Sequence, residues 1–557
     1  MKPSIQTLGQ ILYSPSQYVI PVFQRNYRWE TAQWQKFWES ITEIQNPDKR
    51  GNHFMGFLVF VAGLAQPGQN TTFHLIDGQQ RLTTASILLT ALRNVARRGG
   101  QTELADEIHQ YYLVHPLKKG EQHYRVLPKE RDHDNYLAIV SEQGSPTGRT
   151  AEALAFFETQ LTPLIASSPE SGRTIFDVVC KRLEFMCATL EQESAYNIFK
   201  SLNSTGVPLG PADLIRNFVF MHVVPEEHDE FDHDLWGPLE SGFTREDGTL
   251  DEELFSKFFR DYLMSGGRYV APKETFPSFE SRFEATNFSP KDLARELQES
   301  AQHYAIIRGK RRDKDKRVTA ALVGLNDLDS STTYPVLLAL FGKRAGRVID
   351  SEKLAQAIEM LRGFILRRFI CGESSRGYGQ IFVRALANDQ GDPVKALEKY
   401  LLGRGWPDKT RFENAFIEFP LYQRGYFREV LETLERSRGH KEPADLHAAQ
   451  VEHVLPQTLS DAWREALGKE ADRIQAEWLH RPGNLTLSAY NQELWNHPFE
   501  RKRERYRQSN IVLTREISNY QRWGEEDIRA RGRLLAAEAV KIWTGPIEPT
   551  PAESHGA

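Results

Sequence analysis

The stretch V-E-H-V-L-P at residues 451–456, followed by G-N-L-T-L at 483–487, is the most informative part of the chain. We expect it to begin as a strand that its proline breaks, so that Glu452 and His453 face opposite sides. Glu452 offers a carboxylate oxygen and Asn491 an amide carbonyl oxygen, the kinds of ligand that Mg²⁺ and Mn²⁺ prefer. His453 is then free to take a proton from water, because its ordinary pKa of about 6.5 suits a general base. The pattern predicts a phosphodiesterase that uses one metal ion.

The same residues also have a structural interpretation. A Glu-His pair before a proline is usually the end of a strand whose histidine is only solvated. The later residues favour chemistry instead, because G-N-L-T-L is followed by Asn491 and then by N-H-P-F-E-R-K at 496–502.

In their order and spacing, these residues resemble the HNH, or ββα-metal, nuclease superfamily. They are more closely similar to the end of GmrSD-type modification-dependent restriction enzymes, which carry E-H-(hydrophobic)₂-P-Q, then G-N-L-T-L, then N, then N-x-P-F-x-x-K. The matching residues are Glu452, His453, Pro456, Gln457, Gly483, Asn484, Leu485, Thr486, Leu487, Asn491, Asn496, Pro498, Phe499 and Lys502.

This resemblance implies a role for each residue of the centre. His453 would be the general base, and Asn484 would brace the loop and orient that base. Glu452 and Asn491 would be the metal ligands. The chain departs from many HNH proteins in having no CxxC pair for a structural zinc. Its last motif position is asparagine instead of histidine, so the identity of that ligand stays open.

A second informative stretch, Y-V-I-P-V-F-Q-R-N-Y-R-W at 18–29, begins as a strand and ends in a polar and aromatic cluster. β-branched and aromatic residues predict two further strands at Phe54–Ala62 and Thr71–Ile76. D-G-Q-Q-R at 77–81 then forms a tight turn into a helix. The apolar residues at helical spacing are Leu82, Ala85, Leu89 and Leu92. Backbone N–H groups and the helix dipole at such a junction predict an anion site.

These two motifs resemble the N-terminal module of the same family, marked by I-P-x-F-Q-R-x-Y-x-W and D-G-Q-Q-R-L-T-T. That module is similar to the ParB/sulfiredoxin-like nucleotide-binding fold and implies binding and hydrolysis of a nucleoside triphosphate. The nucleotide-binding residues carried over by position are Gln24, Arg25, Tyr27, Asp77, Gly78, Gln79, Gln80 and Arg81. Asp77 would also be catalytic, by handling metal or water, and Tyr27 and Trp29 would stack on a base.

Some of the aromatic residues near this motif are predicted to lie in the core instead of contacting a nucleotide. The helical spacing of Trp34, Phe37, Trp38 and Ile41 predicts a core stripe.

A third motif, with a helix at Ala195–Asn203 and a second helix opened by Pro211, also matches the N-terminal module. Asn203, Asp213 and Arg216 would complete the nucleotide site, or would simply form a capped helical hairpin with an internal ion pair.

The middle of the chain carries no motif with chemistry. Amphipathic helices are predicted at Leu254–Leu263, Leu293–Ile307, Val318–Leu328, Leu354–Phe369 and Tyr426–Leu434. Residues 365–372, which include Arg367 and Arg368, are expected to pack this bundle against the C-terminal part. The charge run at 308–317 is interpreted as a solvated face, with DNA contact as the alternative. The His/Asp cluster at 228–234 is interpreted as a solvated linker, with a set of metal ligands as the alternative.

Basic residues crowd the stretch after the nuclease motif, where Lys502, Arg503 and Arg505 are predicted to contact DNA phosphates. A last helix at Glu525–Trp543 is expected to cover the nuclease fold. The tail at 546–557 is rich in Pro, Ser and Gly and is expected to be disordered.

The composition limits the remaining possibilities. The 557 residues are too many for one core, and 26% charged residues with 40% apolar residues are typical of a globular protein. The formal net charge of −5 means that DNA contacts must come from local basic patches. No apolar run approaches the roughly 20 residues of a membrane helix, and the three cysteines have no ligand spacing. A cytoplasmic protein without a membrane partner is expected.

We therefore expect an α+β multidomain protein. Its parts would be a ParB/sulfiredoxin-like α/β domain at 1–225, a helical linker domain at 226–440, an HNH nuclease domain at 441–545 and the tail.

The expected function is a nucleotide-regulated, Mg²⁺- or Mn²⁺-dependent endonuclease that restricts phage DNA bearing a modification such as glucosylated hydroxymethylcytosine. One alternative is a phosphorothioate-sensing NTPase and nicking nuclease similar to SspE, which would act on host-marked DNA. Others are a regulatory NTPase with an inactive nuclease domain, and a toxin-like nuclease that cuts RNA or any DNA. The choice of GTP, ATP or another NTP, and the formation of a homodimer, stay open.

Overall fold

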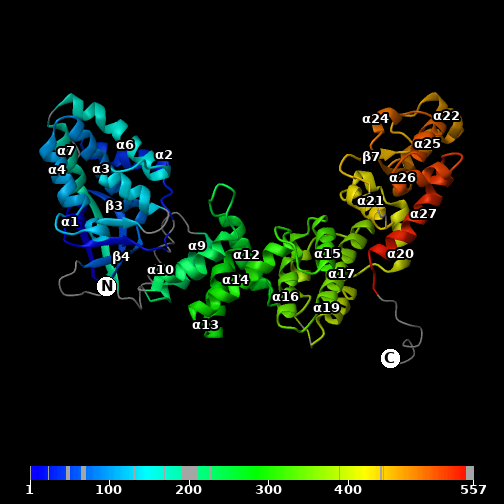
Figure 1. Ribbon diagram of the computed structural model, residues 1–557, viewed down its shortest axis with the longest axis horizontal. Helices are drawn as coiled ribbons and strands as arrows, with labels where there is room; N and C mark the ends of the chain where they lie inside the picture. The colour runs from blue at the N-terminus through cyan, green and yellow to red at the C-terminus, as the bar shows by residue number, and fades with distance from the viewer. Residues whose placement is uncertain are drawn as a thin grey trace. The chain divides into compact units, whose positions relative to one another are not determined.

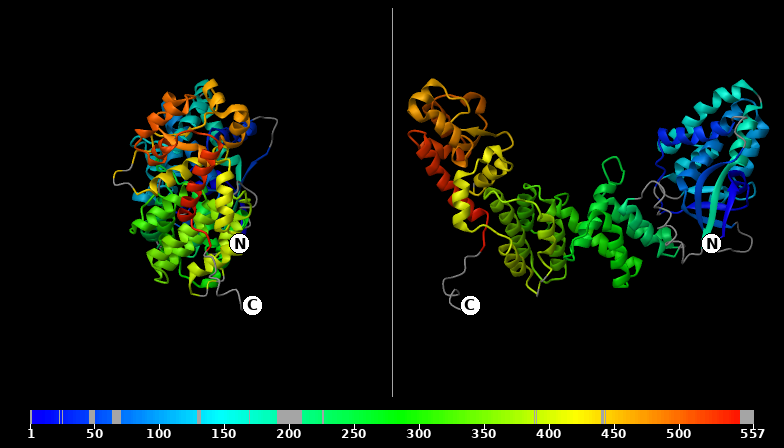
Figure 2. Two further views of the ribbon diagram at one scale, coloured as in Figure 1. Left: turned by 90° about the vertical axis from the view of Figure 1, so that its right-hand side faces the viewer. Right: turned by 180° about the vertical axis from the view of Figure 1, so that it is seen from behind.

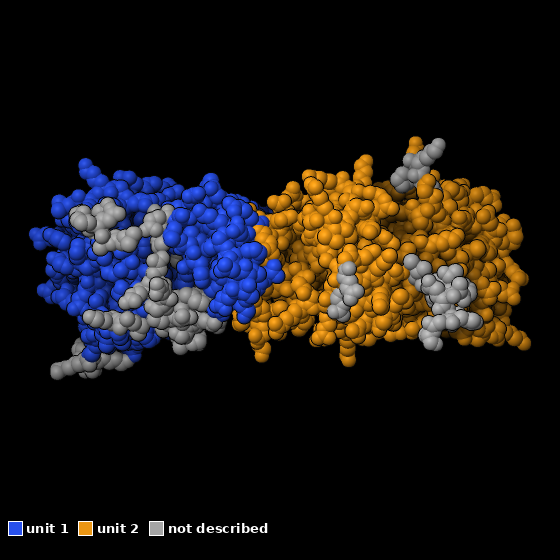
Figure 3. Space-filling view, turned by 90° about the horizontal axis from the view of Figure 1, so that it is seen from below, with its two compact units in different colours: residues 1–252, 279–295 blue, residues 253–278, 296–557 orange. Residues whose placement is uncertain are grey.

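The structure, a computed structural model, describes residues 2–22, 24, 26–45, 51–63, 71–128, 132–168, 170–190, 210–224, 227–387, 389, 391–439, 442 and 444–546. The side chains of residues 2, 45, 491 and 492 lie outside this description. The chain divides into two compact units, which Figure 3 shows in different colours. Unit 1 comprises residues 1–252 and 279–295, and unit 2 comprises residues 253–278 and 296–557. The domain boundaries at 225 and 440 stay predictions. The tail predicted at 546–557 lies outside the described residues from residue 547 on.

Unit 1 is built on a mixed sheet of six strands in the order β1-β6-β3-β4-β2-β5. The strands are β1 (Lys2–Thr7), β2 (Gln17–Ile20), β3 (His53–Ala62), β4 (Thr72–Asp77), β5 (Val126–Pro128) and β6 (Leu183–Leu190). β2 runs parallel to β4 and β5, whereas β3 is antiparallel to β4 and β1 is antiparallel to β6. The α+β class and the three predicted strands are confirmed.

Helices α2, α3, α4, α6 and α7 lie together above strands β3 and β4 in Figure 1. The helices of the first 221 residues are α1 (Leu8–Leu12), α2 (Thr31–Gln45), α3 (Gln79–Arg98), α4 (Thr102–Ile108), α5 (His133–Ser141), α6 (Gly148–Ser167), α7 (Ser171–Arg182) and α9 (Pro211–Met221). α2 buries the predicted stripe of Trp34, Phe37, Trp38 and Ile41 in the core. α3 is buried on nearly all sides, which places the D-G-Q-Q-R motif at the start of a central helix.

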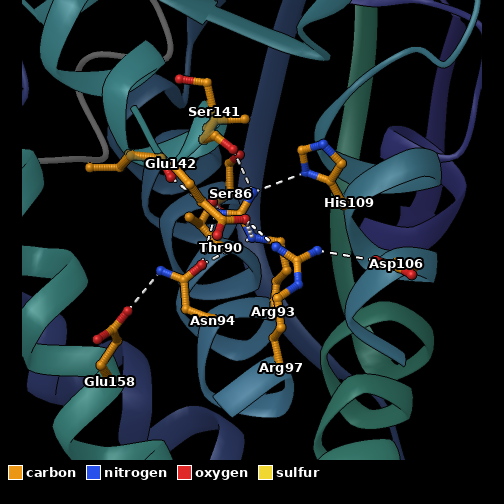
Figure 4. A network of polar contacts seen from close by, with 12 residues as sticks. Ser86, Thr90, Arg93, Asn94, Arg97, Asp106, His109, Ser141, Glu142 and Glu158 are labelled. Carbon is orange, nitrogen blue, oxygen red and sulfur yellow. Dashed lines mark hydrogen bonds and ion pairs between the residues drawn. The ribbon is translucent and has the colours of Figure 1, made fainter. Parts of the chain in front are cut away.

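A buried arginine ties α3 to its neighbours (Figure 4). The guanidinium of Arg93 donates to the carbonyl oxygens of Ile139 (3.0 Å) and Val140, near the C-terminal end of α5. Its Nη1 also lies 3.0 Å from Nδ1 of His109. Burial lowers the pKa of Arg93 to about 10, so the group is still charged at neutral pH. This charge complements the negative end of the α5 dipole and links α3 to α5.

The middle of the chain is helical, as predicted. Its helices are α10 (His228–Phe231), α11 (Gly237–Ser241), α12 (Glu252–Met264), α13 (Thr275–Thr286), α14 (Pro290–Ile307), α15 (Lys316–Asn326), α16 (Tyr334–Ala345), α17 (Ser351–Ile370), α18 (Tyr378–Arg384), α19 (Pro393–Leu402), α20 (Lys409–Glu418) and α21 (Phe427–Arg436). The five predicted amphipathic helices correspond to α12, α14, α15, α17 and α21 and are confirmed. None of the helices in the described ranges is long and apolar enough to cross a membrane.

The C-terminal part, residues 444–546, surrounds an antiparallel pair of strands with helices. The elements are β7 (Gln450–His453), β8 (Leu485–Ser488), α22 (Asp461–Leu467), α23 (Ala471–Trp478), α24 (Asn491–Leu494), α25 (Phe499–Arg507), α26 (Val512–Arg515) and α27 (Glu525–Ile542). Figures 1 and 2 show the red helix α27 beside α20 and α21, and residues of these helices are in contact.

The helical bundle is joined to this part through Arg367 of α17. Its guanidinium donates to the carbonyl oxygens of Trp543 (2.9 Å) and Pro407 (3.0 Å). Since Trp543 is the C-cap of α27, the arginine holds the end of the last helix. The prediction that residues 365–372 pack against the C-terminal part is confirmed.

Candidate active site

The residues of the nuclease motif come together on the β7–β8 pair. His453 ends β7 and pairs with Leu485, the first residue of β8, and Glu452 pairs with Thr486. Because side chains alternate along a strand, Glu452 and His453 face opposite sides of β7. Both side chains are buried. The two sides of this strand therefore have separate chemical environments.

His453 lies in a cluster of ring and amide groups. Its Nδ1 is 3.2 Å from the amide nitrogen of Gln457, and its Nε2 is 3.3 Å from Nδ1 of His480. The ring of Tyr422 meets it edge-on, with centroids 4.4 Å apart. Burial first, and then the neighbouring His480 and Lys502, lower the pKa of His453 to about 3. The imidazole is therefore neutral at physiological pH, but it is a weaker base than the expected pKa of about 6.5 implied. A phosphate anion bound beside it would raise its pKa again.

His480 and Tyr422 are neighbours of His453 that our sequence analysis missed. Their rings stack with centroids 5.6 Å apart and an interplanar angle of 10°. The backbone N–H of Tyr422 also donates to the carbonyl oxygen of His480 (3.1 Å). His480 stands shortly before Asn484 in the sequence, and this closeness to the motif is a signal that could have identified it. No comparable signal points to Tyr422.

Asn484 connects the loop after β7 to two other segments. Its Oδ1 accepts hydrogen bonds from the N–H of Leu455 (2.7 Å) and the indole N–H of Trp523 (3.0 Å). Its amide nitrogen donates to the carbonyl oxygens of Leu455 (3.1 Å) and Leu479 (2.9 Å). The side chain is fully buried. Two of these four hydrogen bonds go to the backbone of Leu455, so Asn484 holds the chain just after His453 and ties it to Leu479 and Trp523.

On the other side of β7, Glu452 is committed to a buried ion pair. Its Oε1 accepts hydrogen bonds from the ammonium of Lys502 (2.8 Å) and the hydroxyl of Tyr506 (3.1 Å). The ammonium also donates to the carbonyl oxygens of His453 (2.9 Å) and Val454 (3.2 Å). Burial raises the pKa of Glu452 and lowers that of Lys502. The prediction that Lys502 contacts DNA is wrong, because this side chain is completely buried.

The same geometry does not fit Glu452 as a metal ligand. A divalent ion at this carboxylate would lie beside the ammonium of Lys502, and the two cations would repel each other in a buried setting. Across the described residues, including the His/Asp segment at 228–234, no three or more His, Cys, Asp or Glu side chains are grouped to hold a metal. The other predicted ligand, Asn491, begins α24, and its side chain lies outside the description.

The two other predicted DNA contacts reach the surface of α25. Arg505 is exposed and forms an ion pair with Glu493 (3.1 Å). Arg503 is half-buried and donates to the side-chain oxygen of Gln521 (2.7 Å). Both guanidinium groups are thus within reach of solvent, unlike Lys502.

The N-terminal motif lies where β4 meets α3. Asp77 ends β4, and Gly78 follows as the N-cap of α3 with a φ of 92°. A Cβ atom at Gly78 would lie 2.5 Å from Cδ2 of Leu58 and 2.6 Å from the carbonyl oxygen of Phe57, so this turn requires glycine. Gly78 has no side chain with which to cap the helix, and no acidic residue lies in the first turn of α3. A helix start of this kind favours an anion.

The segment after β2 lies against this junction. The amide nitrogen of Gln24 donates to the carbonyl oxygen of Ile76 (3.0 Å). Gln80 donates to the carbonyl oxygen of Asn26 (3.1 Å) and accepts from the N–H of Arg28 (2.8 Å). Gln24 and Gln80 therefore hold the two N-terminal motifs together.

The other predicted nucleotide-binding residues differ in accessibility. Asp77 and Arg81 are partly exposed, and Nη1 of Arg81 donates to the carbonyl oxygen of Phe57 (2.9 Å). Gln79 is buried. Arg25 lies outside the described residues.

Tyr27 is part of the core. Its hydroxyl lies 2.6 Å from Oγ1 of Thr84 and accepts the indole N–H of Trp34 (2.8 Å). Burial raises the pKa of Tyr27. The predicted stacking of Tyr27 on a base is wrong, because its ring is enclosed by protein. Trp29 is half-buried and contacts Phe37 through a ring edge, with centroids 5.9 Å apart.

The third motif is described only in its second helix, since Asn203 and the helix predicted at 195–203 lie outside the described residues. Asp213 lies in the first turn of α9. Arg216 forms ion pairs with Asp232 (3.3 Å) and Glu240 (3.4 Å). Both partners lie outside the predicted hairpin, so the expected ion pair within the motif stays a prediction.

Two family models match the chain at both candidate sites. The model for the GmrSD restriction endonuclease N-terminal domain matches residues 8–220, and the model for the GmrSD restriction endonuclease C-terminal domain matches residues 406–538. The first match contains the D-G-Q-Q-R junction, and the second contains His453 with all of its described neighbours. No curated protein matches the chain. The two matched segments together make up more than half of the chain, which therefore belongs to the GmrSD family of type IV restriction endonucleases and acts on DNA.

Proposed function

We propose that this endonuclease cleaves modified DNA at His453, under the control of a nucleoside triphosphate that binds at the β4–α3 junction. The observation that carries the proposal is the neutral, buried imidazole of His453, which a hydrogen-bonded neighbour holds at each nitrogen. A neutral imidazole is the form that can act as a general base. The antiparallel β7–β8 pair followed by α25 supports an HNH-type, ββα arrangement for this centre.

In the proposed reaction, water approaches Nδ1 of His453 from the side of Gln457, which is exposed. His453 takes one proton from the water as the water oxygen bonds to phosphorus. The bond between phosphorus and the 3′ oxygen breaks on the opposite side, and the 3′ oxygen takes a proton from solvent. Asn484 keeps the backbone next to His453 in place, and the exposed Arg505 offers a phosphate contact.

The family resemblance implies a divalent ion, which would stabilise negative charge on the phosphate when bound. Because Glu452 is paired with Lys502, we assign no step to an ion at this carboxylate. Dependence on Mg²⁺ or Mn²⁺ is instead a variable of the cleavage experiment.

The N-terminal junction supports the proposed NTP site for a different reason. The start of α3, where Gly78 supplies no capping side chain and the helix dipole is positive, lies beside the partly exposed Asp77 and Arg81. Such a helix start favours phosphate groups. We propose that this mixed sheet is the ParB/sulfiredoxin-like fold, that Asp77 takes part in hydrolysis and that Arg81 contacts phosphate.

Cleavage assays with the purified full-length protein test the nuclease proposal. Substrates are phage DNA with glucosylated hydroxymethylcytosine, DNA with phosphorothioate links and unmodified DNA, each with Mg²⁺, Mn²⁺ or EDTA and with or without ATP or GTP. We expect the glucosylated DNA to be cut and His453→Ala to reduce the rate by about 10²-fold or more. His447→Ala, at an exposed histidine before β7, is the matched control and should cut normally. Cleavage that survives His453→Ala overturns the proposed base.

NTP turnover tests the junction separately. We expect Asp77→Ala combined with Arg81→Ala to abolish turnover. The combination Asp177→Ala with Lys181→Ala removes the same charge types from a surface ion pair on α7 and should leave turnover unchanged. Equal turnover by the two double variants contradicts the proposed NTP site.

A further inference from the structure

We propose that His480 is a positioning residue that sets the tautomer of His453. Its Nδ1 accepts a hydrogen bond from the Nε2–H of His453, which leaves the lone pair on Nδ1 of His453 to take a proton from water. The inference rests on the proposed function of His453. It adds a residue outside the family motif to the cleavage centre and assigns it a defined hydrogen bond.

Only one assignment of donors and acceptors satisfies both hydrogen bonds of the His453 ring. An amide nitrogen only donates, so the contact of the Gln457 amide nitrogen with Nδ1 (3.2 Å) requires an unprotonated Nδ1. A neutral imidazole then carries its proton on Nε2. Nε2 is 3.3 Å from Nδ1 of His480, which must accept that proton's hydrogen bond. The tautomer of one ring nitrogen is thus set by the partner of the other.

The two ring nitrogens of His453 have different roles, because Nδ1 faces an exposed residue and Nε2 faces a residue that the protein holds in place. Gln457, on the Nδ1 side, is exposed and can give way to an incoming water. His480, on the Nε2 side, is half-buried and is held by the stacked ring of Tyr422 and by the N–H of that residue. His480 therefore fixes the orientation of the His453 ring. The amide of Gln457 occupies the place that the attacking water would take.

The contact between Nε2 of His453 and Nδ1 of His480 also stabilises His453 after it has taken a proton from water. When Nδ1 takes the water proton, His453 becomes an imidazolium with a proton on each nitrogen. Its Nε2–H still has Nδ1 of His480 as acceptor, so the charged form keeps a hydrogen bond inside the protein. Without this acceptor a buried N–H would be left unpaired, and the other tautomer would compete.

Two amide variants separate this role from packing. In His480→Asn the side-chain oxygen sits near the former Nδ1 position, whereas in His480→Gln it sits one bond farther from the backbone. We expect His480→Ala and His480→Gln to lower kcat about 10- to 100-fold with KM nearly unchanged. We expect His480→Asn to recover kcat to within a few-fold of the natural protein. All variants are tested as full-length protein on the glucosylated DNA, with thermal unfolding measured in parallel.

A double-variant comparison links the effect to His453. In a His453→Ala background, His480→Ala should not lower the residual rate further, because the residue acts only through the base. His447→Ala is again the unaffected control. Equal rates for the Asn and Gln variants, or an undiminished loss from His480→Ala in the His453→Ala background, overturn the proposal. If His453→Ala itself leaves cleavage intact, the proposed function fails, whatever the His480 variants do.

Discussion

The ammonium of Lys502 lies 2.8 Å from Oε1 of Glu452, in the interior of the C-terminal part. Its other two hydrogen bonds go to the carbonyl oxygens of His453 and Val454, so each of its three protons has an acceptor. The pair therefore fastens α25 to the end of β7, directly behind the proposed base.

Breaking this pair should destabilise unit 2. Lys502→Met leaves a buried carboxylate without its cation, and Glu452→Gln leaves a buried ammonium, so we expect each to lower the free energy of unfolding by about 3–5 kcal/mol. The double variant should lose less than the sum of the two. Urea unfolding followed by tryptophan fluorescence measures this, with the exposed Lys469→Met as control.

The same variants test the metal assignment. If Glu452 holds a divalent ion instead, Glu452→Gln in EDTA should unfold like the natural protein and lose only its stabilisation by Mg²⁺ or Mn²⁺. That result would contradict the structural role that we assign to the pair.

Asn484 should be sensitive to the change of a single atom. In Asn484→Asp an oxygen replaces the amide nitrogen that donates to Leu455 and Leu479, and it would face their carbonyl oxygens. We expect a loss of about 2–4 kcal/mol and slower cleavage, because the backbone beside His453 loses its support. Asn519→Asp changes an exposed asparagine in the same way and should alter stability by less than about 0.5 kcal/mol. Similar stabilities for the two variants would show that Asn484 does not brace this loop.

Local patterns in the sequence predicted much of the fold. Apolar spacing identified α2, α3 and the main helices of the middle, because each of these helices buries one stripe or all of its surface. Of the six strands of the sheet, β1, β5 and β6 were not predicted. The six residues of β1, K-P-S-I-Q-T, contain one large apolar side chain, and their pairing with β6 depends on contacts far apart in the sequence.

The site could be predicted only where one motif holds all of the information. The order of Glu452, His453 and Asn484 identified the centre, but the contacts of His453 with Tyr422 and His480 arise from folding. Lys502 was assigned to DNA because it lies in a basic run. Its spacing from Phe499 and Tyr506 does place all three on one helix face, and burial of that face accounts for the correction.

Gly483 should resist substitution because α27 packs on it. A Cβ atom at this position would lie 2.1 Å from the carbonyl oxygen of Ile528, which cannot move without the helix. We expect Gly483→Ala to destabilise the C-terminal part by about 1–3 kcal/mol. Gly342→Ala is the matched control, because a Cβ there meets nothing within 4 Å and lies inside α16. Its better helix propensity should add up to about 1 kcal/mol of stability. Equal effects in thermal unfolding would contradict this packing argument.

The buried carboxyl of Asp261 should make unit 2 less stable as pH rises. Burial raises the pKa of Asp261 to about 6, although the hydroxyl of Tyr304, which donates to it (2.9 Å), and the charges of Lys257 and Arg260 lower the pKa. Its pKa in the unfolded chain is about 3.9. Below about pH 4 both states are protonated and no penalty exists. Above about pH 6 the folded state must hold a buried charge, and the difference between the folded and unfolded pKa values corresponds to roughly 3 kcal/mol.

Asp261→Asn removes this penalty while an amide oxygen can still accept from Tyr304. We therefore expect the variant to match the natural protein near pH 4, to become more stable between pH 4 and 7, and to keep a constant advantage above pH 7. Thermal unfolding of both proteins from pH 4 to 8 measures the difference between their stabilities. Taking this difference cancels the titration of all other groups, because the two proteins share them. Asp472→Asn, at an exposed aspartate paired with Arg464, should show a small difference without this rise. A constant difference between Asp261→Asn and the natural protein from pH 4 to 8 would mean that Asp261 titrates as an ordinary aspartate.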